Sequence, residues 1–170
     1  MTGGRRPFRD MRTMKALFDS AEASALQAGE PKPGAEYLVL AALDLPDGSA
    51  RRAFERIGAN PDQFRSAIAG QHAAALRAVG IESIDDSLDG QIPAPSPPRG
   101  PLRTAPSAQK VFRKVVKLLR KEKSELYGAY IVLVAAQAEH GTTARALRYM
   151  GVDPGALGAA AQAELDALKG

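Results

Sequence analysis

Residues that could carry out catalysis or bind a metal are few and scattered in this sequence. The absence of cysteine excludes thiol nucleophiles, disulfides and cysteine–zinc sites. The histidines, His72 and His140, are far apart, and no GxSxG, HExxH or glycine-rich cofactor motif is present. An acidic cluster without the spacing of a calcium loop comprises Glu82, Asp85, Asp86 and Asp89. We interpret this cluster as a solvated loop, and we expect no catalytic residue, no metal site, no cofactor and no enzymatic activity.

The strongest charge pattern is the segment AQKVFRKVVKLLRKEK, residues 108–123. At about 100° per residue, its cations gather on one side of a helix and its apolar residues on the other. The cations of this basic face are Lys110, Arg113, Lys114, Lys117, Arg120 and Lys121. One interpretation is a surface for nucleic acid, anionic lipid or an acidic protein. The other is an amphipathic helix whose outer face is only solvated, and we prefer it because aromatic residues for base stacking are not interleaved elsewhere.

The composition favours a small helical domain. The chain has 170 residues with an apolar fraction of 45%, aromatic residues at 5%, no Trp and a net charge of +4. Abundant alanine lets helices approach closely. No apolar run reaches the roughly 18–20 residues that span a bilayer, and no apolar signal core follows the basic start. We therefore expect a cytoplasmic protein that does not contact membranes.

A duplicated segment organises the rest of the chain. GSARRAFERIGANPDQF at 48–64 aligns with GTTARALRYMGVDPGAL at 141–157 at an offset of 93 residues. Each copy predicts a short helix, a glycine in the left-handed region, an Asn or Asp that caps the next helix, and a proline in its first turn. Ser49 and Thr142 have the residue types of helix N-caps. Arg52 and Arg145 also recur, and we expect both to be solvated.

The duplication extends upstream. GAEYLVLAAL at 34–43 faces GAYIVLVAAQ at 128–137, and alanine pairs with helical flanks favour a buried helix over a buried strand. Helical patterns precede both segments, at 14–28 and 108–123. The sequence therefore predicts an all-α fold of two pseudo-symmetric four-helix repeats, about eight helices, packed as one domain.

The repeats are separated by a proline-rich linker. Prolines recur between Pro93 and Pro106 and exclude a regular helix or a central strand there. We place the first repeat at 8–79, the linker at 80–105 and the second repeat at 106–168.

The order, spacing and duplication of these segments resemble the amino-terminal domain of Clp and Hsp100 proteins. In that family an apolar helix precedes a Gly-Thr-Glu-His-Ile-Leu-Leu-Gly-Leu segment, which is followed by a short helix ending in Leu-Gly. GAEYLVLAAL and GAYIVLVAAQ stand at the position of the Gly-Thr-Glu-His segment in each repeat. RRAFERIG and ARALRYMG stand at the position of the short helix. The resemblance covers about Phe8 to Leu168 and implies a module that binds substrates or adaptors for an unfolding ATPase.

The motor of such proteins has no counterpart in this sequence, which contains no GxxxxGK[ST] phosphate loop. The resemblance therefore implies a free-standing binding protein or a fragment of a longer chain. Its expected partners are a Clp ATPase, adaptors or client proteins, and its expected role is that of adaptor, competitor or regulator in Clp-dependent proteolysis. Small molecules that target such domains are a further expected ligand. The alternative function is nucleic-acid binding through the basic face.

The resemblance also nominates residues. In some ClpC-type members, a Glu in each repeat binds the guanidinium of phosphorylated arginine, and a Thr near each repeat start holds the phosphate. Carried over by position, the first Glu is Glu36, whereas the second falls on Tyr130, which cannot pair bidentately with a guanidinium. We interpret Tyr130 as a packing residue rather than a contact.

The threonine positions are also altered. The position in the second half falls on Ala105, beside Thr104, and the position in the first half falls near Met11, with Thr13 two residues on. The candidate partner-binding residues are therefore Glu36, Tyr37, Thr104, Ala105 and Tyr130.

Overall fold

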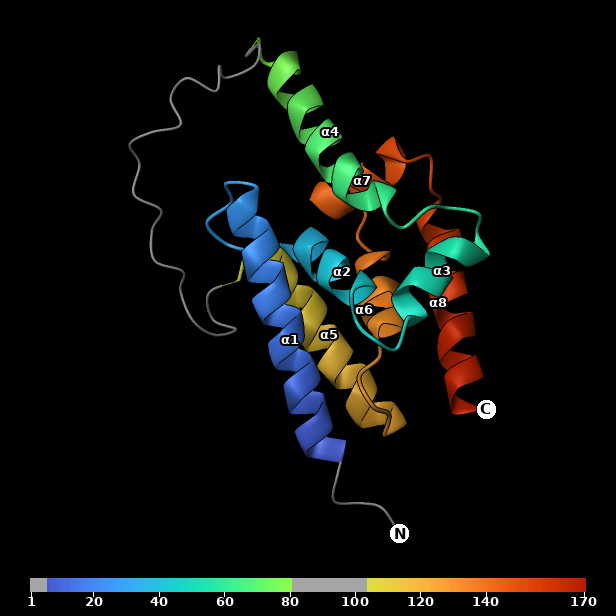
Figure 1. Cartoon of the computed structure of the whole chain (residues 1–170). Helices are drawn as coiled ribbons and strands as arrows, with labels where there is room; N and C mark the ends of the chain where they lie inside the picture. Colours follow the sequence, from blue (N-terminus) through green and yellow to red (C-terminus); the bar gives the residue numbers. More distant parts are fainter. Residues whose placement is uncertain (1–5, 81–103) are drawn as a thin grey trace.

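The computed structural model describes residues 6–80 and 104–170, except for the side chains of residues 6–9, 72 and 75. Every regular element in these ranges is a helix, as the sequence predicts (Figure 1). The helices are α1 (Arg6–Gln27), α2 (Ala35–Leu43), α3 (Ser49–Arg56), α4 (Gln63–Ala78), α5 (Pro106–Glu122), α6 (Gly128–Ala135), α7 (Thr142–Tyr149) and α8 (Pro154–Lys169). The acidic cluster and most of the predicted linker lie outside the described residues.

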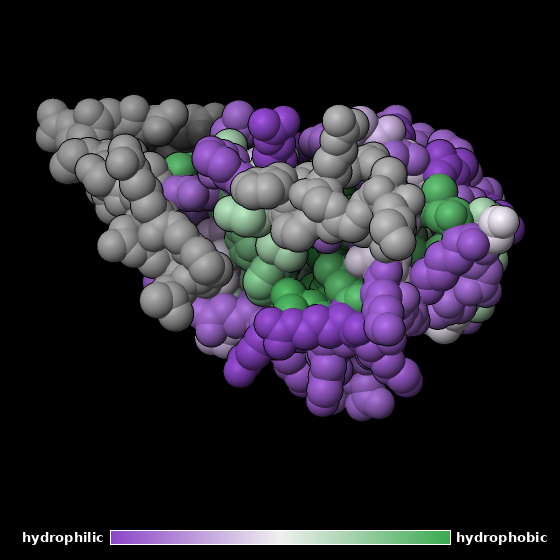
Figure 2. Space-filling view, turned by 90° about the horizontal axis from the view of Figure 1, so that it is seen from below, coloured by the Kyte–Doolittle hydropathy of each residue, from purple (hydrophilic) through white to green (hydrophobic). Residues whose placement is uncertain are grey.

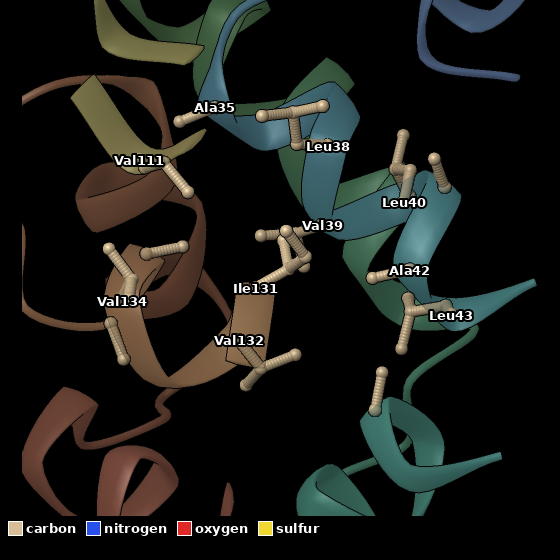
Figure 3. Close-up of a cluster of buried hydrophobic side chains, with 14 of the residues drawn as sticks. Ala35, Leu38, Val39, Leu40, Ala42, Leu43, Val111, Ile131, Val132 and Val134 are labelled. Atoms are coloured by element: carbon tan, nitrogen blue, oxygen red, sulfur yellow. The ribbon is translucent and has the colours of Figure 1, made fainter. Parts of the chain in front are cut away.

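The short helices α2 and α6 form the centre of the molecule. They are apolar on all sides, and nearly all of their side chains are buried. For this reason the spacing of apolar residues in the sequence does not distinguish a helix from a strand in these segments. Figure 3 shows Val39 of α2 beside Ile131 of α6, and the other labelled side chains of both helices belong to the same core cluster. Because both central helices are covered by others, the two halves share one core.

The duplicated corner forms as predicted at its glycines. Gly58 and Gly151 adopt left-handed φ angles of 71° and 72°, which cost glycine little. Asp153 then caps α8 by accepting a hydrogen bond from the Ala156 backbone N–H at 3.1 Å. Asn60 instead accepts from the Asp62 N–H at 3.0 Å, and α4 begins only at Gln63. The cap and proline predictions therefore hold for α8 but not for α4.

The two halves exchange their last helices. In the first half, α4 packs against α7 of the second half, and α8 of the second half packs against α3 and α6. The exchange is asymmetric, because α8 lies along α6 whereas α4 meets α2 only at its start and then extends away from it (Figure 1). As a result, helices of each half pack against helices of the other half.

Side chains of each half satisfy backbone donors of the other. Asp47 Oδ2 accepts from the Gly128 N–H at 3.1 Å, and Ser49 Oγ accepts from the Ala129 N–H at 2.9 Å. Helix starts leave such N–H groups without partners inside the helix. The prediction that Ser49 and Thr142 cap their own helices is wrong, because each is the first helical residue and a glycine precedes it as N-cap.

The recurring arginines are exposed, as expected, but each also contacts the other half, which the sequence did not predict. Arg52 Nε lies 2.8 Å from Glu164 Oε2, and Arg145 Nε donates to Gln71 Oε1 at 3.0 Å. Glu164 and Gln71 are separated by the same offset of 93 residues as the two arginines. Each arginine therefore holds the exchanged helix of the other half by equivalent contacts.

One face of the molecule shows apolar surface in a hollow framed by hydrophilic side chains (Figure 2).

In the described ranges, none of the helices is both long and apolar enough to cross a bilayer.

Candidate functional site

The main candidate site is a cleft where the two halves meet, which we call the interhalf cleft. It has a volume of about 680 Å³. Residues before α2, the start of α5, the end of α6 and the start of α7 line it. Its polar lining includes Glu30, Lys32, Glu36, Ser107, Lys110, Lys114, Glu139, His140, Thr142, Thr143 and Arg145. This size is within the range of ligand sites in proteins, roughly 300–1,000 Å³.

Glu36 is the carboxylate of the cleft that the resemblance nominates. It lies in the first turn of α2 and is half-buried, and no described residue forms an ion pair with it. Burial raises the pKa of Glu36, its own backbone N–H lowers it, and the negative charge of Glu30 raises it further. A cationic ligand would relieve both costs, so this carboxylate is suited to bind one.

Thr143 provides a second polar group. It is only 4% exposed, lines the cleft, and its hydroxyl has no hydrogen-bond partner in the described part of the chain. A buried hydroxyl without a partner is unusual, because the missing hydrogen bond costs stability.

Cations line the same cleft. Lys110 and Lys114 come from α5, and Arg145 comes from α7. Arg145 contacts the neutral amide of Gln71, whereas its counterpart Arg52 contacts a carboxylate. The contact with Gln71 therefore does not neutralise Arg145, whose charge acts on Glu36 across the cleft and lowers the pKa of that carboxyl.

The structure brings some of the nominated residues together and separates others. Glu36 and Ala105 both line the cleft, and Ala105 donates its N–H to the Pro33 carbonyl at 2.9 Å. Thr104 is 5% exposed and lies just before α5. Tyr37 is 4% exposed and lines a different pocket beside α2.

Tyr130 is on α6 and is fully buried in the core of the domain. This burial fits its interpretation as a packing residue. Its hydroxyl donates to Glu122 Oε2 at 2.7 Å, and Lys169 Nζ lies 5.4 Å from its ring centroid. Burial and this hydrogen bond raise the pKa of Tyr130. The second repeat thus presents no counterpart of Glu36 to a ligand.

The cations of the basic face on α5 are exposed but divided between two surfaces. Lys110 and Lys114 line the interhalf cleft. A shallow hollow of about 400 Å³, the α5 hollow, is lined by Phe112, Arg113, Val116, Lys117 and Arg120. The core of the domain takes up the opposite stripe of the helix, Ala108, Val111, Val115 and Leu119. The apolar side of the sequence pattern is therefore explained by packing.

Sequence reasoning missed Thr143 and Arg145 as cleft residues. The equal offset of Arg145 and Arg52 was a usable signal for Arg145. For Thr143 no signal existed, since a threonine in a helix start is ordinary. In the part of the chain that the structure describes, no group of three or more His, Asp or Glu side chains is arranged to hold a metal ion.

Comparison with known proteins identifies the family. The model of the Clp repeat (R) N-terminal domain matches residues 12–140, which is most of the chain. A search of curated proteins finds no match.

Proposed function

Because the chain belongs to the Clp repeat N-terminal domain family, whose members are protein-binding modules of Clp unfoldases, we propose that it binds segments of partner proteins in the interhalf cleft. The partners are clients, adaptors or a Clp ATPase, and the role is that of an adaptor, competitor or regulator in Clp-dependent proteolysis. The domain itself is non-catalytic.

The observation that supports this proposal best is the chemistry of the cleft. A half-buried carboxylate, an unpartnered hydroxyl and cations lie around one opening. This set can bind a polypeptide segment that carries charges of both signs. Glu36 would bind a guanidinium and the cations a phosphate, so phosphoarginine is one group that this chemistry accepts. Since Tyr130 is buried, we expect one such site per chain.

Binding to a permanently unfolded protein tests the proposal. Reduced and alkylated lysozyme, labelled with a fluorophore, should bind the wild-type chain at one site. Glu36→Gln should weaken binding about threefold to tenfold, because a partly buried ion pair is lost. Glu55→Gln, on the exposed face of α3, is the matched control. No binding by the wild type to this client or to a Clp ATPase would contradict the proposal.

Free phosphoarginine, added as a competitor beside free arginine and inorganic phosphate, identifies the recognised group. Displacement of the client by phosphoarginine alone would indicate that both halves of that group are bound. Displacement by none of them would indicate that the cleft recognises peptide rather than the modification.

Nucleic-acid binding is the alternative, supported by the exposure of the basic face on α5. Its test uses a 20-nucleotide single strand and a salt titration. If this alternative holds, binding weakens steeply with salt and is lost in Lys114→Glu combined with Lys117→Glu. The division of these cations between two surfaces disfavours it.

A further inference from the structure

A second pocket lies next to the interhalf cleft, on the first-half side of α2. This first-half pocket has a volume of about 480 Å³ and lies between the end of α1, the helix α2 and the helix α4. Its apolar lining is Ala28, Leu40, Ile68, Ala69, Ala73 and Leu76. Its polar lining is Ser24, Gln27, Glu30, Glu36, Tyr37, Arg65, Gln71 and Thr142. The pocket is large enough for one bulky side chain with neighbouring backbone.

The asymmetric exchange of helices explains why this space is open. In the second half, α8 packs along α6, and its residues Leu157, Ala161 and Leu165 are buried. In the first half, α4 turns towards α7 and makes much less contact with α2. The small side chains Ala69 and Ala73 of α4 line the space that remains. The pocket therefore lies where the counterpart of the α6–α8 contact is reduced.

An unpartnered polar group lies in this pocket. Tyr37 is 4% exposed, and its hydroxyl has no hydrogen bond to any described residue. Burial, together with the negative charges of Glu36 and Glu30, raises the pKa of Tyr37 to about 12, so the hydroxyl stays protonated. The ring of Tyr37 is buried, but its hydroxyl is not sealed off from the pocket, so it can donate a hydrogen bond to a ligand, such as a peptide carbonyl.

The charges at the opening define the ligand further. Glu30 and Glu36 lie on the side of the pocket that adjoins the cleft, since both line the two spaces together with Thr142. Arg65 is an exposed residue of α4, on the other wall. One extended segment can therefore place an apolar side chain in the pocket and a cation at the two carboxylates.

We propose that the first-half pocket receives a large apolar side chain of a bound protein segment, and that Glu30 and Glu36 bind a Lys or Arg next to it. This inference rests on the proposed function. It specifies the motif that the protein recognises in its partner, which is a bulky apolar residue beside a basic one. Tyr37 donates a hydrogen bond to the backbone of the same segment.

The test uses a labelled peptide, Gly-Ser-Leu-Arg-Ser-Gly, and fluorescence anisotropy with the full chain. Replacing its Leu by Ala should weaken binding about tenfold to fiftyfold, because the side chain no longer fills the pocket. Replacing its Arg by Glu should also weaken binding, because the new charge faces two carboxylates. Equal affinity for all three peptides would overturn the proposal.

Variants of the protein locate the peptide. Ala73→Leu fills the pocket and should weaken binding at least tenfold, whereas Ala74→Leu, an exposed neighbour on the same helix, should leave it unchanged. Tyr37→Phe should weaken binding about twofold to tenfold without lowering the melting temperature, because the hydroxyl has no partner inside the protein. Unchanged binding in both Ala73→Leu and Tyr37→Phe would overturn the assignment.

The unfolded lysozyme client separates this inference from the proposed function. If the wild type binds the client and Ala73→Leu binds it equally well, the pocket assignment is overturned and the proposed function stands. If the wild type binds the peptide in the pocket but neither the client nor a Clp ATPase, the proposed function is overturned and the pocket stands as a peptide site.

Discussion

At the scale of residues, Glu164 joins α8 to α3 through a cluster of opposite charges. Its side chain is 7% exposed and accepts hydrogen bonds from Arg52 at 2.8 Å and Arg56 at 2.6 Å. Burial opposes the charged form, but the two guanidinium groups outweigh it and lower the pKa of Glu164. The folded protein therefore holds this carboxylate in its ionised form more strongly than the unfolded chain does.

Glu164→Gln should lower the free energy of unfolding by about 1–2 kcal/mol at pH 7, because charge-assisted hydrogen bonds become neutral ones. A group with a lowered folded pKa stabilises above its unfolded pKa, about 4.3 for Glu, and loses this contribution as pH falls through the folded pKa. The difference between wild type and variant should therefore shrink below about pH 4. Urea unfolding at pH 7, 5 and 3.5 measures it. A constant difference across this range would contradict the ionic explanation.

Ser49 makes a contact that the sequence pattern does not indicate. Ser49→Ala should cost about 1–3 kcal/mol, because the buried N–H of Ala129 loses its acceptor. Ser66→Ala, at an exposed position of α4, should change stability by less than about 0.5 kcal/mol. Thermal unfolding of both variants checks the prediction, and equal melting temperatures would show that the cross-half bond contributes nothing.

The residues that sequence could place are those with local roles. The helix ends at Gly58 and Gly151 could be predicted because they depend only on the local backbone conformation, which glycine adopts easily. Ser49, Arg52 and Arg145 act on partners 74 to 112 residues away, so the local rules give solvation or capping as the default and miss the contact. Glu36 was found only through the family pattern, and its lack of an ion-pair partner could not be read from sequence.

At the scale of elements, the helix α6 starts in direct contact with the first half. A Cβ atom on Gly128 would lie 2.9 Å from the Ala42 carbonyl oxygen and 3.0 Å from the Ala50 Cβ. These neighbours are backbone and a buried methyl group, so neither can move without shifting α2 or α3. The close approach of three helices therefore depends on this glycine.

A matched pair of substitutions tests that dependence. Gly128→Ala should destabilise the protein by about 1–3 kcal/mol, because the added methyl group overpacks the contact. Gly158→Ala, inside α8 where a Cβ would meet nothing within 4 Å, should instead stabilise by about 0.5–1 kcal/mol through helix propensity. Chemical unfolding compares them, and a stabilising Gly128→Ala would show that the contact is looser than the structure indicates.

The existence of every helix could be predicted, but not every boundary. The corner motif is repeated in sequence, yet α8 starts directly at Pro154 while Pro61 lies in a turn before α4. Asp153 caps a helix, whereas Asn60 caps only that turn. Aligned residues can take different local conformations, because packing on α7 or on α3 decides which one is stable.

At the scale of the whole molecule, the exchange of helices was not predictable from the repeat. The prediction that the two repeats pack as one domain is confirmed, but a tandem duplication does not determine which helices pack across the halves. The choice depends on contacts between residues far apart in the chain, which helical periodicity does not encode. The exchange also leaves α4 with little contact to α2, and the first-half pocket lies between these two helices.

The exchange also predicts that neither half folds alone. A fragment of residues 6–80 would lack α7 and α8, which cover α4 and α3. A fragment of residues 104–170 would lack Asp47 and Ser49, whose side chains cap α6. Each fragment should therefore show little helical circular dichroism and no cooperative thermal transition. Mixing the two at equal concentration should restore helix content, because the buried surfaces of α2 and α6 then meet. A cooperative transition in either isolated fragment would show instead that the repeats are independent units, and that the cleft between them is a contact of two preformed domains.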